Sequence, residues 1–99
     1  MSFVMAQPEM LASAAGDLQG VGAMLNASNA AAAAPTTGVA PAAADPVSAL
    51  TAMQFSAHAV LYQQISAQAA EMHEMFVATL MASAGSYAAT EDANAVVTR

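Results

Sequence analysis

The chain has 99 residues, of which 58% are hydrophobic and only 8% are charged, and its net charge is −6. The single basic residue is Arg99 and there is no cysteine. This composition argues against nucleic-acid binding, binding to anionic membranes, disulfides and thiolate chemistry. The length allows one domain, residues 1–99. The first ten residues lack a positive n-region and a continuous apolar h-region, and no window is apolar enough to span a bilayer, so we expect neither a conventional signal peptide nor a membrane span.

Pro8 and Glu9 predict the start of a first helix that runs to about residue 34, after a short extended arm. Proline fits the first helical position because its missing N–H has no partner there. An acidic side chain in the first turn lies at the positive end of the helix dipole. From these residues alone, the pair Pro8-Glu9 indicates a helix start and nothing more.

The predicted helix 8–34 has two different faces. One face carries three leucines in heptad spacing, Leu11, Leu18 and Leu25. Gly16 and Gly20 lie on nearly the opposite face, where small residues allow another backbone to come close. Each glycine costs about 1 kcal/mol of helix propensity. Either these glycines are weaknesses that tertiary packing tolerates, or the helix is sandwiched between a second helix and a second protein; we favour the sandwich.

Pro35, Gly38 and Pro41 favour turns, so residues 35–45 predict a loop between two antiparallel helices. Asp45 is suited to cap the second helix and Pro46 to begin it. We expect this helix over residues 46–84 and a C-terminal tail over residues 85–99, because Gly85 is the first helix breaker after Pro46. At about 1.5 Å per residue, the helix is on the order of 55–60 Å long. That length exceeds what a compact domain of this size can hold.

The second predicted helix carries one long apolar stripe. Phe55, Tyr62, Ala69 and Phe76 are spaced by seven, and His58, Ile65 and Met72 follow the first three by three residues; Leu80 extends the same arc. Such spacing is typical of helices that pack against other helices. An ordinary core-facing helix explains each residue alone, but the length of the stripe does not fit a small globule.

We find no catalytic residues, no metal ligands and no cofactor site in the sequence. His58 and His73 are fifteen residues apart on one helix, too far to share a metal, and neither has a carboxylate in an E-x-x-H arrangement. A nucleophile elbow and a phosphate-binding glycine loop are also missing. We therefore predict no enzymatic activity and no small-molecule substrate. His58 is expected to be an interface histidine with a hydrogen-bond partner, and His73 a surface histidine.

Both helices carry more apolar surface than one hairpin contact can cover. Buried apolar area is worth about 25 cal/mol per Å², and leaving these arcs in water would forfeit several kcal/mol of a total stability of only about 5–15 kcal/mol. The fold class is therefore all-α, an antiparallel helical hairpin that completes a four-helix bundle with two helices from another chain. Periodicity does not decide whether the other chain is a second copy or a different protein.

Three stretches resemble a known family: the start MSFVMAQPEM with Pro8 and Glu9, the segment NAAAAAPTTGVAPAAADPVSALTA and the motif SYAATE. They resemble the N-terminal domain of the mycobacterial PE family over essentially the whole chain. The chain ends where a bare PE domain ends, so it resembles short members without a glycine-rich or enzymatic extension.

The resemblance implies a partner and an export route. PE domains are helical hairpins that form heterodimeric bundles with a PPE protein, while an EspG-type chaperone binds the PPE protein in the cytosol. They are exported by type VII (ESX) secretion. The sequences of the loop and of SYAATE here most resemble those of members exported by the fifth ESX system. A secreted or cell-surface protein with a host-interaction or cell-envelope role is implied. From the apolar arcs and the glycine ridge, we expect the partner interface to comprise Leu11, Gly16, Leu18, Gly20, Leu25, Phe55, His58, Tyr62, Ile65, Met72, Phe76 and Leu80.

The resemblance also implies an export motif, Y-x-x-x-[D/E], at Tyr87 and Glu91, near a W-x-G turn of the PPE protein. The two residues share a face only if the helix continues past Gly85. From the spacing alone, Tyr87 is simply the end of the apolar stripe and Glu91 a solvated acid. The resemblance favours the export signal.

Two other classes remain as alternatives. A homo-oligomeric helical bundle with a structural role would bury the same apolar arcs. A membrane-active amphipathic protein is disfavoured because basic residues are almost absent. An enzyme ranks last.

Overall fold

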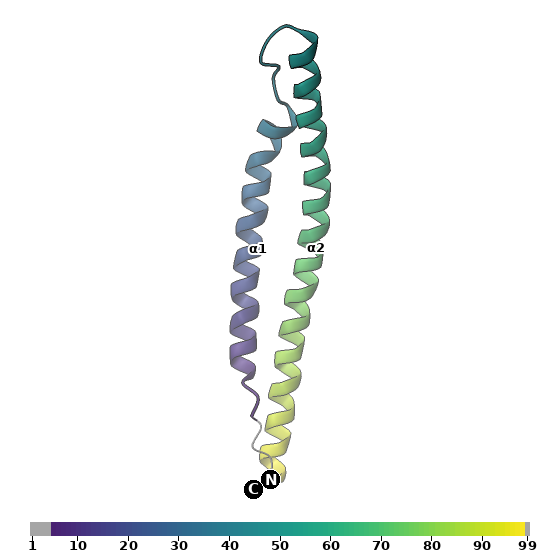
Figure 1. The fold of residues 1–99 in the computed structure, drawn as a ribbon. Coiled ribbons are helices and arrows are strands. Elements are labelled where there is room, and N and C mark those ends of the chain that lie inside the picture. Colours follow the sequence, from purple (N-terminus) through teal and green to yellow (C-terminus); the bar gives the residue numbers. More distant parts are fainter. Residues whose placement is uncertain (1–4, 99) are drawn as a thin grey trace. The chain divides into compact units, whose positions relative to one another are not determined.

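The computed structural model describes residues 5–98 and contains two helices, α1 (Pro8–Thr37) and α2 (Pro46–Val97), which pack as a hairpin (Figure 1). No strand occurs among these residues. The chain divides into two compact units, each of which contains part of both helices. We call Met1–Gly22 with His73–Arg99 the terminal unit, and Ala23–Met72 the loop unit. The all-α hairpin predicted from the sequence is confirmed.

The start of α1 is where the sequence predicts it. Pro8 is the first helical residue, and the carbonyl of Gln7 accepts hydrogen bonds from the N–H groups of Met10 (3.1 Å) and Leu11 (3.3 Å). Glu9 lies in the first turn. Gln7 therefore provides the first acceptor, and Pro8 contributes a fixed φ without losing a needed donor.

The end of α1 lies three residues beyond the predicted position. The helix includes Pro35 and ends at Thr37 rather than near residue 34. Thr36 Oγ1 donates to the carbonyl of Ala32 (2.6 Å), and Thr37 Oγ1 donates to that of Ala33 (2.7 Å). These hydroxyls bind carbonyls of the last turn, which helps the helix to continue past a proline for a few residues.

α2 begins with a well-formed cap at Asp45. Its Oδ1 accepts from the N–H of Ser48 (2.9 Å), and its Oδ2 accepts from the Ser48 hydroxyl (2.7 Å). These two bonds, the backbone bond first, lower the pKa of the Asp45 carboxyl below its ordinary value. Pro46 occupies the first helical position. The predicted cap and helix start are confirmed.

α2 runs through Gly85 to Val97, so the predicted helix end at residue 84 and the separate tail from residue 85 are wrong. A single glycine in a helix costs about 1 kcal/mol relative to alanine. The residues that follow Gly85 are mostly good or neutral helix formers without proline, and Thr90 Oγ1 bonds the carbonyl of Ser86 (2.9 Å) within the same helix. The cost of one glycine is thus too small to end α2.

The core of the hairpin consists of alanine. Ala15 and Ala84 are buried in the terminal unit, and Ala52 and Ala59 in the loop unit; among the described residues, no large side chain is fully buried. Helices whose contact faces carry methyl groups approach closely, but they remove little apolar area from water. Within residues 5–98, neither helix is long and apolar enough to cross a membrane.

Candidate functional site

The loop unit leaves its large apolar side chains on α2 in contact with solvent. Phe55 and Ile65 are each 64% exposed, Tyr62 is 52% exposed and Met72 is 66% exposed. His58 is also exposed. The half-buried residues of α2 in this unit lie on another face and are small or polar: Ser48, Ala49, Ser56, Gln63, Ser66 and Ala70. The large side chains of the predicted heptad stripe are therefore more exposed than buried in this unit, and they do not form the main contact face with α1.

The terminal unit continues the same arrangement in its own part of α2. Phe76 is 54% exposed and Tyr87 is 52% exposed, whereas Leu80 is half-buried. Val77, Leu80 and Ala84 are half-buried or buried, so they belong to the face of α2 that contacts α1. Phe76 lies next to this face and is not part of it. Contiguous apolar patches of this kind mark interaction surfaces.

On α1, the three predicted leucines separate. Leu11 and Leu18 are half-buried in the terminal unit, while Leu25, in the loop unit, is 56% exposed. Gly16 and Gly20 face open space, since a Cβ atom at either position would meet no atom within 4 Å. One face of α1 thus packs on α2, as the sandwich interpretation requires, and side chains added on the glycine ridge would meet none of the described residues.

His73 is not the surface residue that the sequence predicts. It is half-buried, and its Nε2 lies 2.6 Å from the carbonyl oxygen of Leu18 on α1. Gly22, which the sequence analysis did not single out, lies beneath its ring: a Cβ at this position would be 2.7 Å from His73 Cδ2. The prediction failed because His73 flanks the large apolar stripe, and that stripe is not the face that meets α1. In the sequence, Gly22 is marked only by its heptad spacing from Ala15, a residue that is buried in the structure.

In the loop unit, Asn29 links α1 to α2. The Tyr62 hydroxyl donates to Asn29 Oδ1 (2.9 Å), and Gln63 Nε2 donates to the Asn29 carbonyl (3.0 Å). At the end of α1, the N–H of Val39 donates to Ser56 Oγ (3.1 Å). These polar contacts fasten a hairpin whose buried side chains are too small to define the pairing.

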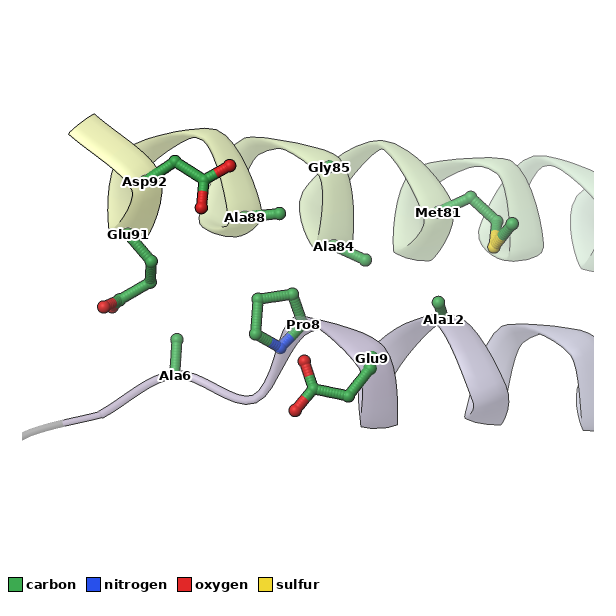
Figure 2. A pocket seen from close by; sticks show the side chains of 10 residues that line it. All are labelled: Ala6, Pro8, Glu9, Ala12, Met81, Ala84, Gly85, Ala88, Glu91 and Asp92. Carbon is green, nitrogen blue, oxygen red and sulfur yellow. The ribbon is translucent and has the colours of Figure 1, made fainter. Parts of the chain in front are cut away.

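An open groove of about 560 Å³ lies at the end of the terminal unit (Figure 2). Ala12, Ala84, Gly85 and Ala88 supply its small apolar wall, with Met81 beside them. The groove brings Pro8 and Glu9, from the start of α1, together with Glu91 and Asp92, from the end of α2. Pro8 and Glu9 therefore line the same groove as Glu91, one of the two residues of the Y-x-x-x-[D/E] motif.

Tyr87 does not line this groove. Because α2 continues through Gly85, Tyr87 and Glu91 are four residues apart on one unbroken helix and lie on neighbouring turns. Both side chains are exposed. The condition for a shared face, a helix that continues past Gly85, is met.

Within residues 5–98, no group of three His, Cys, Asp or Glu side chains is placed to hold a metal ion. The features that the structure does offer are the exposed apolar stripe of α2 and a groove lined by three acidic side chains, Glu9, Glu91 and Asp92.

Comparison with known proteins agrees with these features. The model of the PE family matches residues 4–94. This chain belongs to the PE family. It is 70% identical over 95 residues to the PE family protein PE13 of Mycobacterium tuberculosis, and the match covers 96% of both chains. The resemblance seen in the sequence is therefore confirmed at the level of the family.

Longer members share the same region. The PE family protein PE8 of M. tuberculosis is 56% identical over 94 residues, which are 95% of this chain and 34% of PE8. PE_PGRS33, a PE-PGRS family protein, is 59% identical over 95 residues, 20% of its length. The PE hairpin thus occurs both in chains of about this size and as part of longer proteins. None of these three names states a reaction.

Proposed function

We propose that this PE chain is one half of a heterodimer with a PPE protein, that the pair is exported through a type VII secretion system, and that the chain has no catalytic role. One observation carries the proposal: among residues 5–98 the buried residues are alanines, while most of the large apolar side chains of α2, including Phe55, Ile65 and Phe76, remain more than half exposed.

The energetics require a cover for these side chains. Full burial of a side chain such as Ile or Phe is worth about 1.5–3 kcal/mol, and a whole domain is stable by only about 5–15 kcal/mol. Phe55, Ile65 and Phe76 are still 64%, 64% and 54% exposed, so covering the rest of them would gain roughly 3–5 kcal/mol, a large share of that total stability. A second helical pair placed on this face would give a four-helix bundle, in which the PE hairpin supplies half of the core.

The exposed pair Tyr87 and Glu91 supports the export part of the proposal. An aromatic ring and a carboxylate four residues apart on a continuous helix form a compact feature that a secretion component can recognise. Before export the complex is cytoplasmic, with an EspG-type chaperone bound through the PPE protein. After export, the heterodimer acts at the cell surface or outside the cell, in host interaction or in the envelope.

The direct test is co-purification. A tagged copy of the chain is co-expressed with individual PPE proteins, and the stoichiometry of the purified complex is measured. We expect a one-to-one complex with a cognate PPE protein. Failure to retain any PPE protein, combined with a stable homomeric assembly, would overturn the proposal in favour of a self-assembling bundle.

A further inference from the structure

The buried residues of the terminal unit do not by themselves define how α1 and α2 are aligned. Ala15 and Ala84 are 0% and 5% exposed, and methyl groups on a helix surface look alike after a shift of one heptad. In helical pairs, one polar residue at a seam position commonly fixes the register. His73 occupies such a position, since it is half-buried against α1.

The hydrogen bond of His73 has a defined direction. Nε2 lies 2.6 Å from the Leu18 carbonyl oxygen, which can only accept, so Nε2 carries the proton. The contact is therefore a donated hydrogen bond that ties α2 to α1 at this point.

The His73 ring also leaves no room for a Cβ atom at position 22, where the chain has glycine. A Cβ at Gly22 would lie 2.7 Å from His73 Cδ2 and 2.9 Å from Nε2. Seven residues before Gly22 is Ala15, and seven residues after it is Asn29. A shift of one heptad in either direction would place a residue with a Cβ where the ring now lies, and the ring would have to turn away from the Leu18 carbonyl.

We propose that His73, seated over Gly22 and bonded to the Leu18 carbonyl, is a positioning residue that fixes the register of α1 and α2 in the terminal unit. Its consequence is the terminal groove, where this register brings Pro8 and Glu9 of α1 and Glu91 of α2 into the lining of one groove. This inference about the register does not rest on the proposed function.

Register is measured with a pair of nitroxide labels on cysteines introduced at Asp17 and Ala89, both exposed, in a chain that has no cysteine of its own. Ala89 lies 16 residues beyond His73, the partner of Leu18, and Asp17 lies one residue before Leu18. In antiparallel helices these two steps run in the same direction, so the labels are offset by 15 residues, about 22 Å along the helices. A shift of one heptad changes this offset by about 10 Å. The full chain is used in the assembled form in which it purifies, alone or with a PPE protein.

In the unsubstituted chain we expect a single distance between the two nitroxide labels. The same distance is expected in His73→Gln, whose amide can still donate a hydrogen bond. In His73→Leu we expect a second distance or a changed one. An unchanged single distance in His73→Leu would overturn the inference and leave the proposed function untouched. Conversely, absence of any PPE complex would overturn the proposed function and leave the register result standing.

Thermal unfolding of glycine variants gives a test that remains available if His73→Leu does not fold. Gly22→Ala is expected to lower the unfolding midpoint, whereas the matched control Gly20→Ala, with open space around its Cβ, leaves it unchanged or raises it. In a His73→Ala background, Gly22→Ala should raise the midpoint, because the clash is gone and alanine favours the helix. If Gly22→Ala behaves like Gly20→Ala while His73 is present, the ring does not select the glycine, and the inference fails.

Discussion

The hydroxyl of Tyr62 donates a hydrogen bond to Asn29 Oδ1 at 2.9 Å, although the Tyr62 side chain remains 52% exposed. The next residue, Gln63, donates to the carbonyl of the same asparagine. One aromatic residue thus has two roles. Its hydroxyl holds α2 to α1 in the loop unit, and its open ring belongs to the apolar face proposed for the PPE partner.

Replacement of Tyr62 by Phe separates these roles. We expect a loss of about 0.5–1.5 kcal/mol in the free energy of unfolding, towards the lower end because the bond is exposed, and unchanged partner binding. Urea denaturation followed by circular dichroism measures the loss. Asn29→Ala should cost a similar amount, and the double variant should add little. Full additivity of the two losses would mean that the hydrogen bond is not their cause.

Charges placed on the exposed apolar face should prevent assembly. Ile65→Glu or Phe76→Asp would bury an unpaired carboxylate in the heterodimer, which costs far more than one contact contributes. We expect the PPE complex to disappear from co-purification. Gln64→Glu, at an exposed neighbouring position, is the matched control and should leave the yield unchanged. Normal yields of the Ile65 and Phe76 variants would contradict the interface.

The export motif can be tested apart from the interface. Tyr87→Ala removes the ring of the Tyr87–Glu91 pair and leaves the helix intact, because alanine is a strong helix former. We expect a normal PPE complex inside the cell and loss of the protein from the culture medium and cell surface. Val97→Ala, at an 82% exposed position near the same helix end, is the control. Unchanged secretion of Tyr87→Ala would argue against an export signal at this position.

The cap of α2 should make the stability of the folded chain depend on pH. Hydrogen bonds from Ser48 lower the pKa of Asp45 in the folded chain, so this carboxylate stabilises α2 above the unfolded value of about 3.9. That contribution is lost as the pH falls through the lower, folded pKa. Asp45→Asn keeps a capping oxygen but does not titrate. Near pH 6, the thermal midpoint of the unsubstituted chain should exceed that of Asp45→Asn. This difference should vanish at a pH below the folded pKa of Asp45.

Asp45→Ala is the companion variant for this measurement. It removes the cap itself, so it should lower the thermal midpoint at every pH. A constant difference between the unsubstituted chain and Asp45→Asn across the whole pH range would show that titration of Asp45 does not contribute to stability.

Local signals in the sequence predicted the helix starts correctly. Pro8 and Asp45-Pro46 act within one turn, so their effect does not depend on the rest of the fold. The ends were predicted less well. Proline and glycine raise the cost of a helix but do not forbid it, and the hydroxyls near Pro35 and the alanines near Gly85 offset that cost.

The packing faces were harder to predict, because α2 has both a face of large apolar residues and a face of small ones. A projection of the sequence finds both but does not say which one meets α1. Alanine faces allow the closest approach, and the structure pairs them, with Ala59 and Ala84 buried and Phe55 exposed. His73 follows the small face, so its contact with Leu18 was not foreseen. The predicted role of His58 as an interface residue remains a prediction, since its side chain is exposed.

The central claim is that the exposed apolar faces require a PPE partner. The measurement that tests it most directly is size-exclusion chromatography with light scattering, together with far-UV circular dichroism, on the chain made alone and with a PPE protein. We predict aggregation or poor helicity alone, and a helical one-to-one complex with the partner. A monodisperse, fully helical chain that binds no PPE protein would contradict the claim, because its apolar faces would then be covered by copies of itself.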